Sequence, residues 1–229
     1  MTHRIVYLLL AATLNPLGLL GQSLSVSSPE ADNSVAAQLA SFQIAEGYEV
    51  NLFADESMGI ANPVCFRWDA EGRLWVLCTW AYPQPKPGEK ADDKLFILED
   101  KDQDGKADKI STFADGLNMP TGFALGHGGV YLAEGPDLVH LRDTNGDGKA
   151  DQREVLFTGF GTGDTHQNIN SLAWSPGGEL FFCQGLHCFS RVQTPWGIAR
   201  LDEHGSWRLR PLLRQLHSYR RTSGGGNPW

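Results

Sequence analysis

Apolar residues alternate with polar ones in three separate stretches of the chain, and each stretch has a glycine-containing turn between two alternating runs. The stretches are Val64–Leu77, Thr121–Leu132 and Ser171–Phe182. The second run of each holds aromatic or β-branched residues, which favour strands. Equivalent positions in the three stretches, Leu74, Val130 and Leu180, are 56 and 50 residues apart. The pattern predicts three β-hairpins that recur with the period of a repeat protein.

A second repeat lies out of phase with these hairpins. Leu95–Asp100 matches Leu138–Asp143, 43 residues further on, and Ile198–Asp202 is a weaker third copy. Each unit therefore offers a hairpin, an outer strand and a loop, which is the content of a four-stranded propeller blade. We expect Phe42–Phe53 to form a lone strand pair that completes the last blade. The predicted fold is an all-β propeller over residues 42–229.

Three full units and a partial fourth are fewer than most propellers need, since propellers have about four to eight blades. We therefore interpret residues 42–229 as the N-terminal portion of a propeller that is truncated at its C-terminus. On this interpretation, downstream domains of a longer protein are its expected partners. A small complete domain is the alternative.

The composition agrees with a turn-rich β protein, because 26 glycines and 12 prolines accompany 10% aromatic residues. A chain that is 41% hydrophobic and 20% charged is neither disordered nor collagen-like. The formal net charge is −8, and no run rich in lysine and arginine is present to neutralise phosphates. Nucleic acid is therefore not an expected partner.

Residues 1–23 have the pattern of a secretory signal peptide. His3 and Arg4 form a short basic head, Ile5–Leu14 is apolar, and small residues follow at Gly21 and Ser23. The apolar run is shorter than the roughly 20 residues of a membrane span. We expect cleavage, a secreted or periplasmic location and no stable membrane span afterwards. The small polar residues 24–41 are expected to form a flexible leader.

Export permits disulfides, and the chain has four cysteines: Cys65, Cys78, Cys183 and Cys188. Cys65 and Cys78 flank the turn of the first predicted hairpin, so one interpretation is a cross-strand bridge. Four small buried thiols are the other interpretation.

Two acidic loops follow the outer strands. Residues 143–154 match the calcium-loop pattern D-x-[DN]-x-[DN]-G-x5-E in full, whereas residues 100–108 repeat its front and have Ser111 in place of the final glutamate. The pattern surrounds a hard cation with side-chain oxygens at alternate positions, one backbone carbonyl and a terminal carboxylate. The candidate Ca²⁺ ligands are Asp143, Asn145, Asp147, Lys149, Asp151 and Glu154 in one loop, and Asp100, Asp102, Asp104, Lys106 and Asp108 in the other.

A solvated turn is the alternative for both loops, because Asp, Asn and Gly favour turns for local reasons. Against it, each loop crowds four acidic groups that repel one another unless a cation offsets them. No helical pattern flanks either loop, so the expected role of Ca²⁺ is structural. The Asp100 loop, which lacks the final glutamate, is expected to bind more weakly.

Several segments together resemble the propeller domain of planctomycete-type membrane-bound dehydrogenases, which is related to the quinoprotein sorbosone and soluble glucose dehydrogenases. The segments are Glu46–Val50, Asp115–Gly122, the acidic loop around Asp143, His166–Leu172 and Thr194–Gly197. The resemblance covers residues 42–229 and implies a secreted six-bladed propeller. In longer members, helical-repeat and haem-binding modules follow such a domain. No haem site is encoded in this chain.

The resemblance also implies a catalytic site. In the sugar dehydrogenases, a histidine on a comparable stretch removes a hydroxyl proton while hydride passes to pyrroloquinoline quinone (PQQ). His166 matches this base, and Gln167 and Asn227 match cofactor-binding positions. By its own chemistry a neutral imidazole accepts protons near physiological pH, and Asp164 is placed to orient it. The alternative is a loop histidine that only hydrogen-bonds a neighbouring blade.

Two departures weaken the match to a quinone site. Leu186 follows Gly185 where the related enzymes carry an acidic residue, and Gly226 replaces the arginine of their Arg-Asn-Pro-like motif. A carboxylated quinone loses a bidentate anchor when that guanidinium is missing. The isolated chain is therefore expected to be inactive.

Two functions remain open, besides a gene fragment with no independent activity. One is the propeller portion of a quinone-dependent sugar or aldehyde dehydrogenase-like protein that binds a small-molecule or glycan substrate. The other is a non-catalytic, secreted, calcium-binding propeller that binds a glycan or a protein. Trp80 and Tyr82, in a proline-rich loop, are candidates for stacking on a sugar ring or are simply exposed. His127 and His140 are expected at the surface.

Overall fold

The structure is a computed structural model that describes residue 32 and residues 34–220. The chain divides into two compact units, residues 1–43 and 44–229. In the first unit, helix α1 (Val35–Ser41) begins at Ser34, whose Oγ accepts a hydrogen bond from the Ala37 N–H. This helix lies in the predicted leader. The predicted signal peptide, residues 1–23, lies outside the described residues.

The second unit is built from antiparallel strands, and strands make up 46% of the described residues. The first sheet has the order β1 (Pro63–Trp68), β2 (Leu74–Cys78), β3 (Asp93–Glu99) and β4 (Lys109–Leu117). The second has the order β5 (Pro120–Gly126), β6 (Gly129–Glu134), β7 (Asp137–Arg142) and β8 (Gln152–Thr158). The prediction of an all-β chain is confirmed. Within residues 34–220, no helix is long and apolar enough to cross a membrane.

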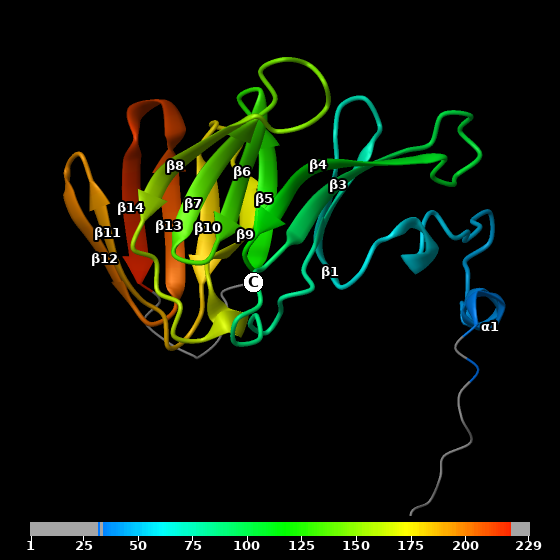
Figure 1. Cartoon of the computed structure of the whole chain (residues 1–229), viewed down its shortest axis with the longest axis horizontal. Helices are drawn as coiled ribbons and strands as arrows, with labels where there is room; N and C mark the ends of the chain where they lie inside the picture. Colours follow the sequence, from blue (N-terminus) through cyan, green and yellow to red (C-terminus); the bar gives the residue numbers. More distant parts are fainter. Residues whose placement is uncertain (1–31, 33, 221–229) are drawn as a thin grey trace, which may run out of the picture. The chain divides into compact units, whose positions relative to one another are not determined.

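The third four-stranded sheet contains an insertion. Its strands are β9 (Asn170–Trp174), β10 (Leu180–Gln184), β13 (Gly205–Arg210) and β14 (Gln215–Arg220), and a separate hairpin, β11 (Phe189–Thr194) with β12 (Gly197–Asp202), intervenes between β10 and β13. The described residues also contain three short 3₁₀-helices: η1 (Glu56–Met58) precedes β1, η2 (Thr165–Gln167) lies between β8 and β9, and η3 (Pro211–Leu213) lies between β13 and β14. Figure 1 shows the order of these elements.

All three predicted hairpins are confirmed as β1–β2, β5–β6 and β9–β10, and the predicted outer strands β3 and β7 are confirmed as well. The prediction that Ile198–Asp202 forms the third outer strand is wrong. Ile198–Asp202 is β12, which pairs with β11, whereas β13 pairs with β10. Strand β13 takes this place because Trp207 and Leu209 are fully buried and complete the core.

The predicted strand pair at Phe42–Phe53 is also wrong, since the structure contains no strand there. The segment turns at Gly47, which has a φ of 83°, and Tyr48 N–H donates to the Ala45 carbonyl across this turn. A strand needs a ladder of backbone hydrogen bonds with a neighbour, and no described strand forms such a ladder with this segment, although the Ala107 N–H donates to the Phe53 carbonyl at 2.8 Å.

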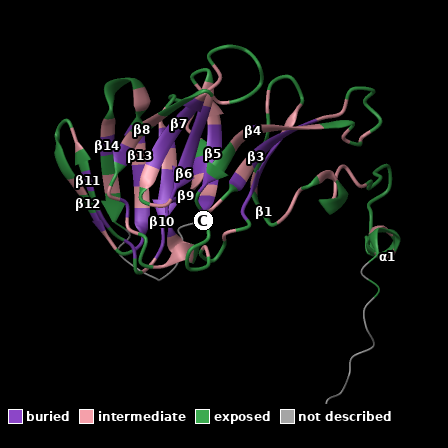
Figure 2. Ribbon diagram, viewed as in Figure 1, coloured by how far each residue is buried: buried purple, intermediate pink, exposed green. Residues whose placement is uncertain are grey.

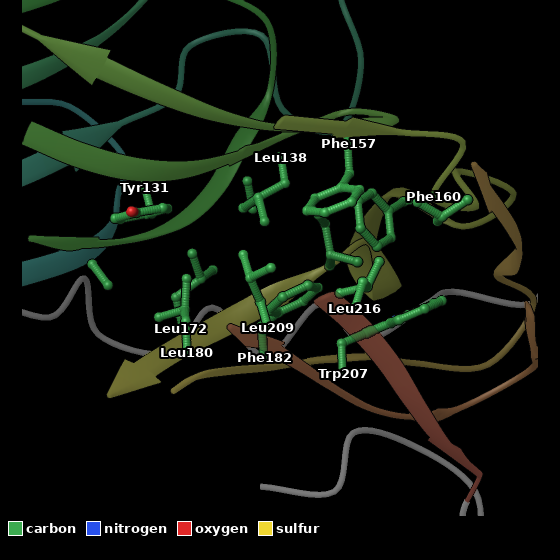
Figure 3. Packing of buried hydrophobic residues seen from close by; sticks show 14 of the residues in the cluster. Tyr131, Leu138, Phe157, Phe160, Leu172, Leu180, Phe182, Trp207, Leu209 and Leu216 are labelled. Carbon is green, nitrogen blue, oxygen red and sulfur yellow. The ribbon is translucent and has the colours of Figure 1, made fainter. Parts of the chain in front are cut away.

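The sheets pack face to face, with the first strands β1, β5 and β9 in contact with one another. One apolar cluster fills the space between the second and third sheets, where Phe182, Trp207 and Leu209 pack against Leu138 and Phe157 (Figure 3). A second cluster joins the first and second sheets through Leu77, Leu95, Phe123 and Leu132. Buried residues accordingly follow the middle strands (Figure 2).

All four cysteines lie within the described residues, and the structure forms no disulfide between them. Cys65 pairs with Leu77 across β1–β2, so Cys65 and Cys78 lie on opposite faces of the sheet and cannot form the bridge considered above. His140, expected at the surface, is only 5% exposed, so that prediction is wrong. Its ring stacks on Tyr131 and its Nε2 contacts the Gly126 carbonyl at 3.2 Å. Burial lowers the pKa of His140.

Two equivalent phenylalanines test this packing. Phe123 in β5 is fully buried, whereas Phe66, at the same place in β1, is 61% exposed. We expect Phe123→Ala to lower the free energy of unfolding by about 3–5 kcal/mol, because the change leaves a cavity. Phe66→Ala should lower it by less than about 1 kcal/mol. Denaturant titration of both variants measures the difference, and equal losses would contradict the packing described here.

Candidate functional site

A pocket of about 580 Å³ opens beside the first strands of the three sheets. Strands β1 and β5, the start of β9, the loop after β2 and helix η2 supply its walls, and the lining residues include Arg67, Tyr82, Met119, Thr165 and His166. The pocket therefore collects residues from all three sheets. It contains the predicted base, His166, and one of the two aromatic residues proposed for sugar stacking, Tyr82.

Asp164 holds the His166 ring. The Asp164 carboxylate caps η2 by accepting the His166 backbone N–H at 3.0 Å, and the same oxygen lies 3.1 Å from the ring Nδ1. A carboxylate only accepts hydrogen bonds, so the neutral ring carries its proton on Nδ1 and leaves Nε2 free to accept another. The side chain of His166 is 62% exposed, so this nitrogen is accessible. The expected orienting role of Asp164 agrees with this geometry.

Tyr82 forms the aromatic wall beside His166. The two rings meet edge to face, with centroids 5.2 Å apart and an interplanar angle of 82°. Tyr82 is 40% exposed, so part of its surface faces solvent. Trp80 packs against Phe96 at 6.2 Å and is absent from the pocket lining. Of the two aromatic candidates, Tyr82 is therefore the one at the site.

The loop that carries Tyr82 is fixed by Asp93, which is fully buried. One carboxylate oxygen accepts the backbone N–H groups of Trp80 at 2.6 Å and Ala81 at 2.9 Å. The other accepts the Thr79 hydroxyl and the Met119 backbone N–H, each at 2.8 Å. A buried carboxylate is costly unless it is hydrogen-bonded, and this one has four donors. Asp93 thus ties two walls of the pocket together.

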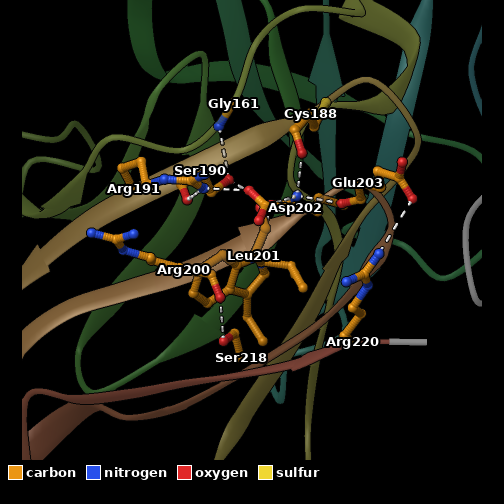
Figure 4. A network of polar contacts seen from close by, with 12 residues as sticks. Gly161, Cys188, Ser190, Arg191, Arg200, Leu201, Asp202, Glu203, Ser218 and Arg220 are labelled. Atoms are coloured by element: carbon orange, nitrogen blue, oxygen red, sulfur yellow. Dashed lines mark hydrogen bonds and ion pairs between the residues drawn. The ribbon is translucent and has the colours of Figure 1, made fainter. Parts of the chain in front are cut away.

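The segment that carries His166 is fixed from the other side by the inserted β11–β12 hairpin. Arg191 N–H donates to the Gly159 carbonyl at 2.8 Å, and Gly161 N–H donates to the Ser190 hydroxyl at 2.9 Å. A Cβ added at Gly159 or Gly161 would meet backbone atoms of β11 or of Cys188 at 2.4 to 2.9 Å, so only glycine permits this approach. Figure 4 shows the polar contacts around Ser190.

Gln184 is the buried centre of these contacts. Its amide nitrogen donates to three carbonyls, including that of Cys188 at 2.6 Å, and its amide oxygen accepts from Ser190 and Trp207. Sequence reasoning did not identify Gln184 or Asp93, because their partners are distant loops. The alternating glycines 159, 161 and 163 were the one available signal of a close backbone approach.

The two predicted cofactor-binding residues are placed differently. The Gln167 side-chain oxygen accepts the Leu186 N–H at 2.9 Å, and the side chain packs over Gly185 and not among the pocket-lining residues. Gln167 therefore supports the turn after β10. Asn227 lies outside the described residues. Arg67 is a lining residue that sequence reasoning missed; its guanidinium donates to the carbonyls of Phe66 and Leu172.

In the Asp100 loop, oxygens of Asp100, Asp102 and Asp108 lie within 4.8 Å of one another. Backbone N–H groups shape the loop: those of Gln103 and Gly105 donate to the Asp100 carboxylate, and that of Lys101 donates to Asp108 at 2.6 Å. Asp104 accepts the Lys106 N–H at 2.9 Å. Hard oxygen donors at this spacing fit Ca²⁺.

The Asp143 loop has the same backbone frame. Asp143 accepts N–H groups from Asn145, Gly146 and Gly148, Asp147 accepts that of Lys149, and Asp151 accepts that of Thr144. The Gly148 N–H is the largest cause that lowers the pKa of Asp143. Glu154, predicted to close the site, instead lies on β8, where it pairs with Arg214 and approaches Arg142 at 4.0 Å.

The role of Asp93 is testable. Asp93→Ala leaves several buried donors without a partner, and we expect it to cost at least about 3 kcal/mol of unfolding free energy. The neighbouring variant Asp92→Ala removes an exposed carboxylate and should change stability little. In the milder variant Asp93→Asn, the ring proton shifts of His166 should move because Tyr82 is displaced. NMR shifts of His166 that stay unchanged would rule out this positioning role.

Comparison with protein-family models matches residues 34–226 to a domain of unknown function, DUF7133. A search of curated proteins found no match. The matched range includes the fourteen strands of the described residues, both acidic loops and every lining residue given for the His166 pocket. The chain belongs to the DUF7133 family.

Proposed function

We propose that the second unit is part of a β-propeller in which the three four-stranded sheets are consecutive blades. Three observations support this fold. Each sheet follows the previous one in the chain, their first strands are in contact, and each face between two sheets is filled by one apolar cluster. In a propeller, the first strands line the central axis, and ligands bind at its mouth.

The proposed activity is that of a secreted or periplasmic, quinone-dependent dehydrogenase acting on a CH–OH group of a sugar or aldehyde hydrate. The observation that carries this proposal is the Asp164–His166 pair beside Tyr82 in a pocket of about 580 Å³. A histidine base oriented by a carboxylate, next to an aromatic ring, suits proton removal from a hydroxylated ligand.

His166 Nε2 accepts the hydroxyl proton of the substrate in this scheme. Asp164 stabilises the imidazolium that results, since its carboxylate already faces Nδ1. Tyr82 offers a ring face and edge against which a sugar ring packs. Thr165, which also lines the pocket, has a hydroxyl that can hydrogen-bond a polyol.

PQQ is the cofactor that the sequence resemblance implies, and Arg67 provides the test of fit. Among the described side chains, no carboxylate lies within ion-pair distance of the Arg67 guanidinium, which is held only by carbonyls. A pocket-lining guanidinium without a counter-ion fits a carboxylated ligand. Arg67 is therefore the residue that would hold such a cofactor. The quinone, when bound, supplies the hydride acceptor.

The alternative is a non-catalytic, calcium-binding propeller that binds a glycan or protein. It is favoured by the placement of Gln167, because this residue, which the resemblance implies as a cofactor contact, supports a turn and does not line the pocket. Sugar binding without turnover distinguishes this alternative from the dehydrogenase.

The activity assay uses a full-length version of the protein with PQQ, Ca²⁺, a panel of monosaccharides and an artificial electron acceptor, because the isolated chain is expected to be inactive. We expect acceptor reduction that falls about 10²–10⁴-fold in His166→Ala, because a general base contributes that much. His187→Ala is the matched control, since this exposed histidine is not a lining residue. Saturable sugar binding with no reduction by the wild-type full-length protein would favour the non-catalytic alternative. Full activity of His166→Ala would reject His166 as the base.

The calcium proposal is tested separately. We propose that both acidic loops bind Ca²⁺ as structural sites, and we expect chelation to lower the melting temperature because ligand binding stabilises the folded state. Asp102→Asn should weaken Ca²⁺ binding by removing one of the three clustered carboxylates. Asp92→Asn, an exposed carboxylate outside the loops, is the control. An absence of calorimetric binding, together with an unchanged melting temperature, would contradict the proposal.

A further inference from the structure

A second pocket, of about 640 Å³, lies between the first and second sheets. Its walls include Trp68 at the end of β1, the turn that follows, Trp75 of β2 and Leu125 of β5. The His166 pocket lies at the other ends of these strands, where β1 and β5 begin. The two pockets are therefore separate, and the proposed dehydrogenase makes no use of this one.

The three first strands carry one equivalent residue near their ends. In each hairpin this residue pairs with the leucine or valine that marks the repeat, and the equivalent residues are Trp68 in β1, Leu125 in β5 and Trp174 in β9. Leu125 packs against the cluster that joins the first and second sheets, and Trp174 packs against the cluster between the second and third. The same place in two neighbouring interfaces is thus held by a leucine in one and by a tryptophan in the other.

Trp174 shows what this place accepts. Its ring meets Tyr131 of the second sheet edge to face, with centroids 5.4 Å apart and an interplanar angle of 85°. Its Nε1–H donates to the Leu125 carbonyl at 2.7 Å. A Cβ added at Gly126 would come within 2.7 Å of the ring, so the backbone lies close against the indole. The interface between the second and third sheets is therefore shaped to hold one indole.

The interface between the first and second sheets has the same frame without the ring. Trp75 follows Leu74 as Tyr131 follows Val130, and it lines the pocket. Trp75 is held by its hairpin turn, since its Nε1–H donates to Asp69 at 2.8 Å. Trp68, whose carbonyl is equivalent to the one that Trp174 binds, also lines the pocket. Leu125 is smaller than a tryptophan and leaves the space open, and a ligand that fills it restores the missing contacts.

The charges around the pocket restrict the ligand further. Three carboxylates line it, those of Asp69, Glu71 and Asp143, against one guanidinium, that of Arg73. Asp69 accepts the side chains of Arg73 and Trp75 and two backbone N–H groups, so its oxygens are occupied. The side chain of Glu71 is 66% exposed and free to meet a ligand. This excess of negative charge disfavours an anionic ligand and favours a cationic one.

We propose that this pocket binds a planar heteroaromatic amine of about the size of indole, whose ring takes the place that Trp174 takes in the neighbouring interface. The ring packs against Trp75 and Leu125, and its N–H donates to the Trp68 carbonyl. The amino group faces the carboxylates of Glu71 and Asp143. This site goes beyond the proposed dehydrogenase and does not depend on it.

The test titrates the full chain with tryptamine and follows the Nε1–H signal of Trp75 by NMR. A chelator in the buffer keeps the charge of Asp143 uncompensated. We expect a saturable shift of this signal. Indole-3-acetate, which has the same ring and the opposite charge, should bind at least about tenfold more weakly. Methylation of the ring nitrogen removes the donor and should weaken binding about tenfold.

Filling the pocket provides the matched variants. Leu125→Trp places an indole in the space, as Trp174 does in the next interface, and should abolish the shift. Leu125→Phe fills less of the space, is the variant more certain to fold, and should weaken binding. Val155→Trp adds the same ring at a position that is 42% exposed and does not line the pocket, so binding should persist.

The reverse change tests the equivalence of the two interfaces. Trp174→Leu gives the second interface the residue of the first, and we expect calorimetry to count two bound indoles per chain in place of one. The proposal is overturned if tryptamine gives no saturable shift up to its solubility limit, or if Leu125→Trp binds it as the wild-type chain does. None of these measurements uses electron transfer, so loss of the proposed dehydrogenase activity leaves this inference standing.

Discussion

The structure depends on one constraint, which is that a sheet with two apolar faces must be covered on both. Strand β6 illustrates it: Val130 and Leu132 face the first sheet, whereas Tyr131 and Ala133 face the third. Alternate residues of one strand thus enter two different cores. Neither core forms unless neighbouring sheets are present, so the stacking of sheets and the pairing of strands are a single cooperative event. Phe66 of β1, which is 61% exposed, marks the place where this constraint is not met by the described residues.

Local patterns predicted the elements that need only local information. The three hairpins were found because alternation and a glycine turn lie within a dozen residues of each other, and both β3 and β7 follow from a matched sequence. Strand pairings and contacts between residues far apart in the sequence could not be predicted in this way. Apolar and polar residues alternate in Ile198–Asp202 as they would in a third strand. The strand that pairs with β10 is nevertheless β13, which contributes the fully buried Trp207 to the core. His140 was expected at the surface because the sequence does not reveal that Tyr131 covers it.

In the candidate site, too, contacts between residues close in the sequence could be predicted, and contacts between distant residues could not. Asp164 and His166 are two residues apart, so their contact could be inferred from the sequence, and the structure adds Tyr82 from a loop some eighty residues away. Asp93 and Gln184 hold these loops in place, yet each acts through backbone groups that carry no sequence signature. The acidic motif located two loops with similar backbone contacts, and the structure adds that Glu154, the last position of the motif, pairs with Arg214 and approaches Arg142.

The central claim is that the three sheets radiate from their first strands, and distances between spin labels test it most directly. Labels carried by a genetically encoded amino acid, with the four cysteines intact, are placed at Arg67 and Ala173 on first strands and at Lys109 and His217 on outermost strands. Pulsed electron–electron double resonance should give a clearly shorter distance for the pair on the first strands than for the pair on the outermost strands. Equal distances for the two pairs would mean that the sheets are stacked in parallel layers, and that result would contradict the account.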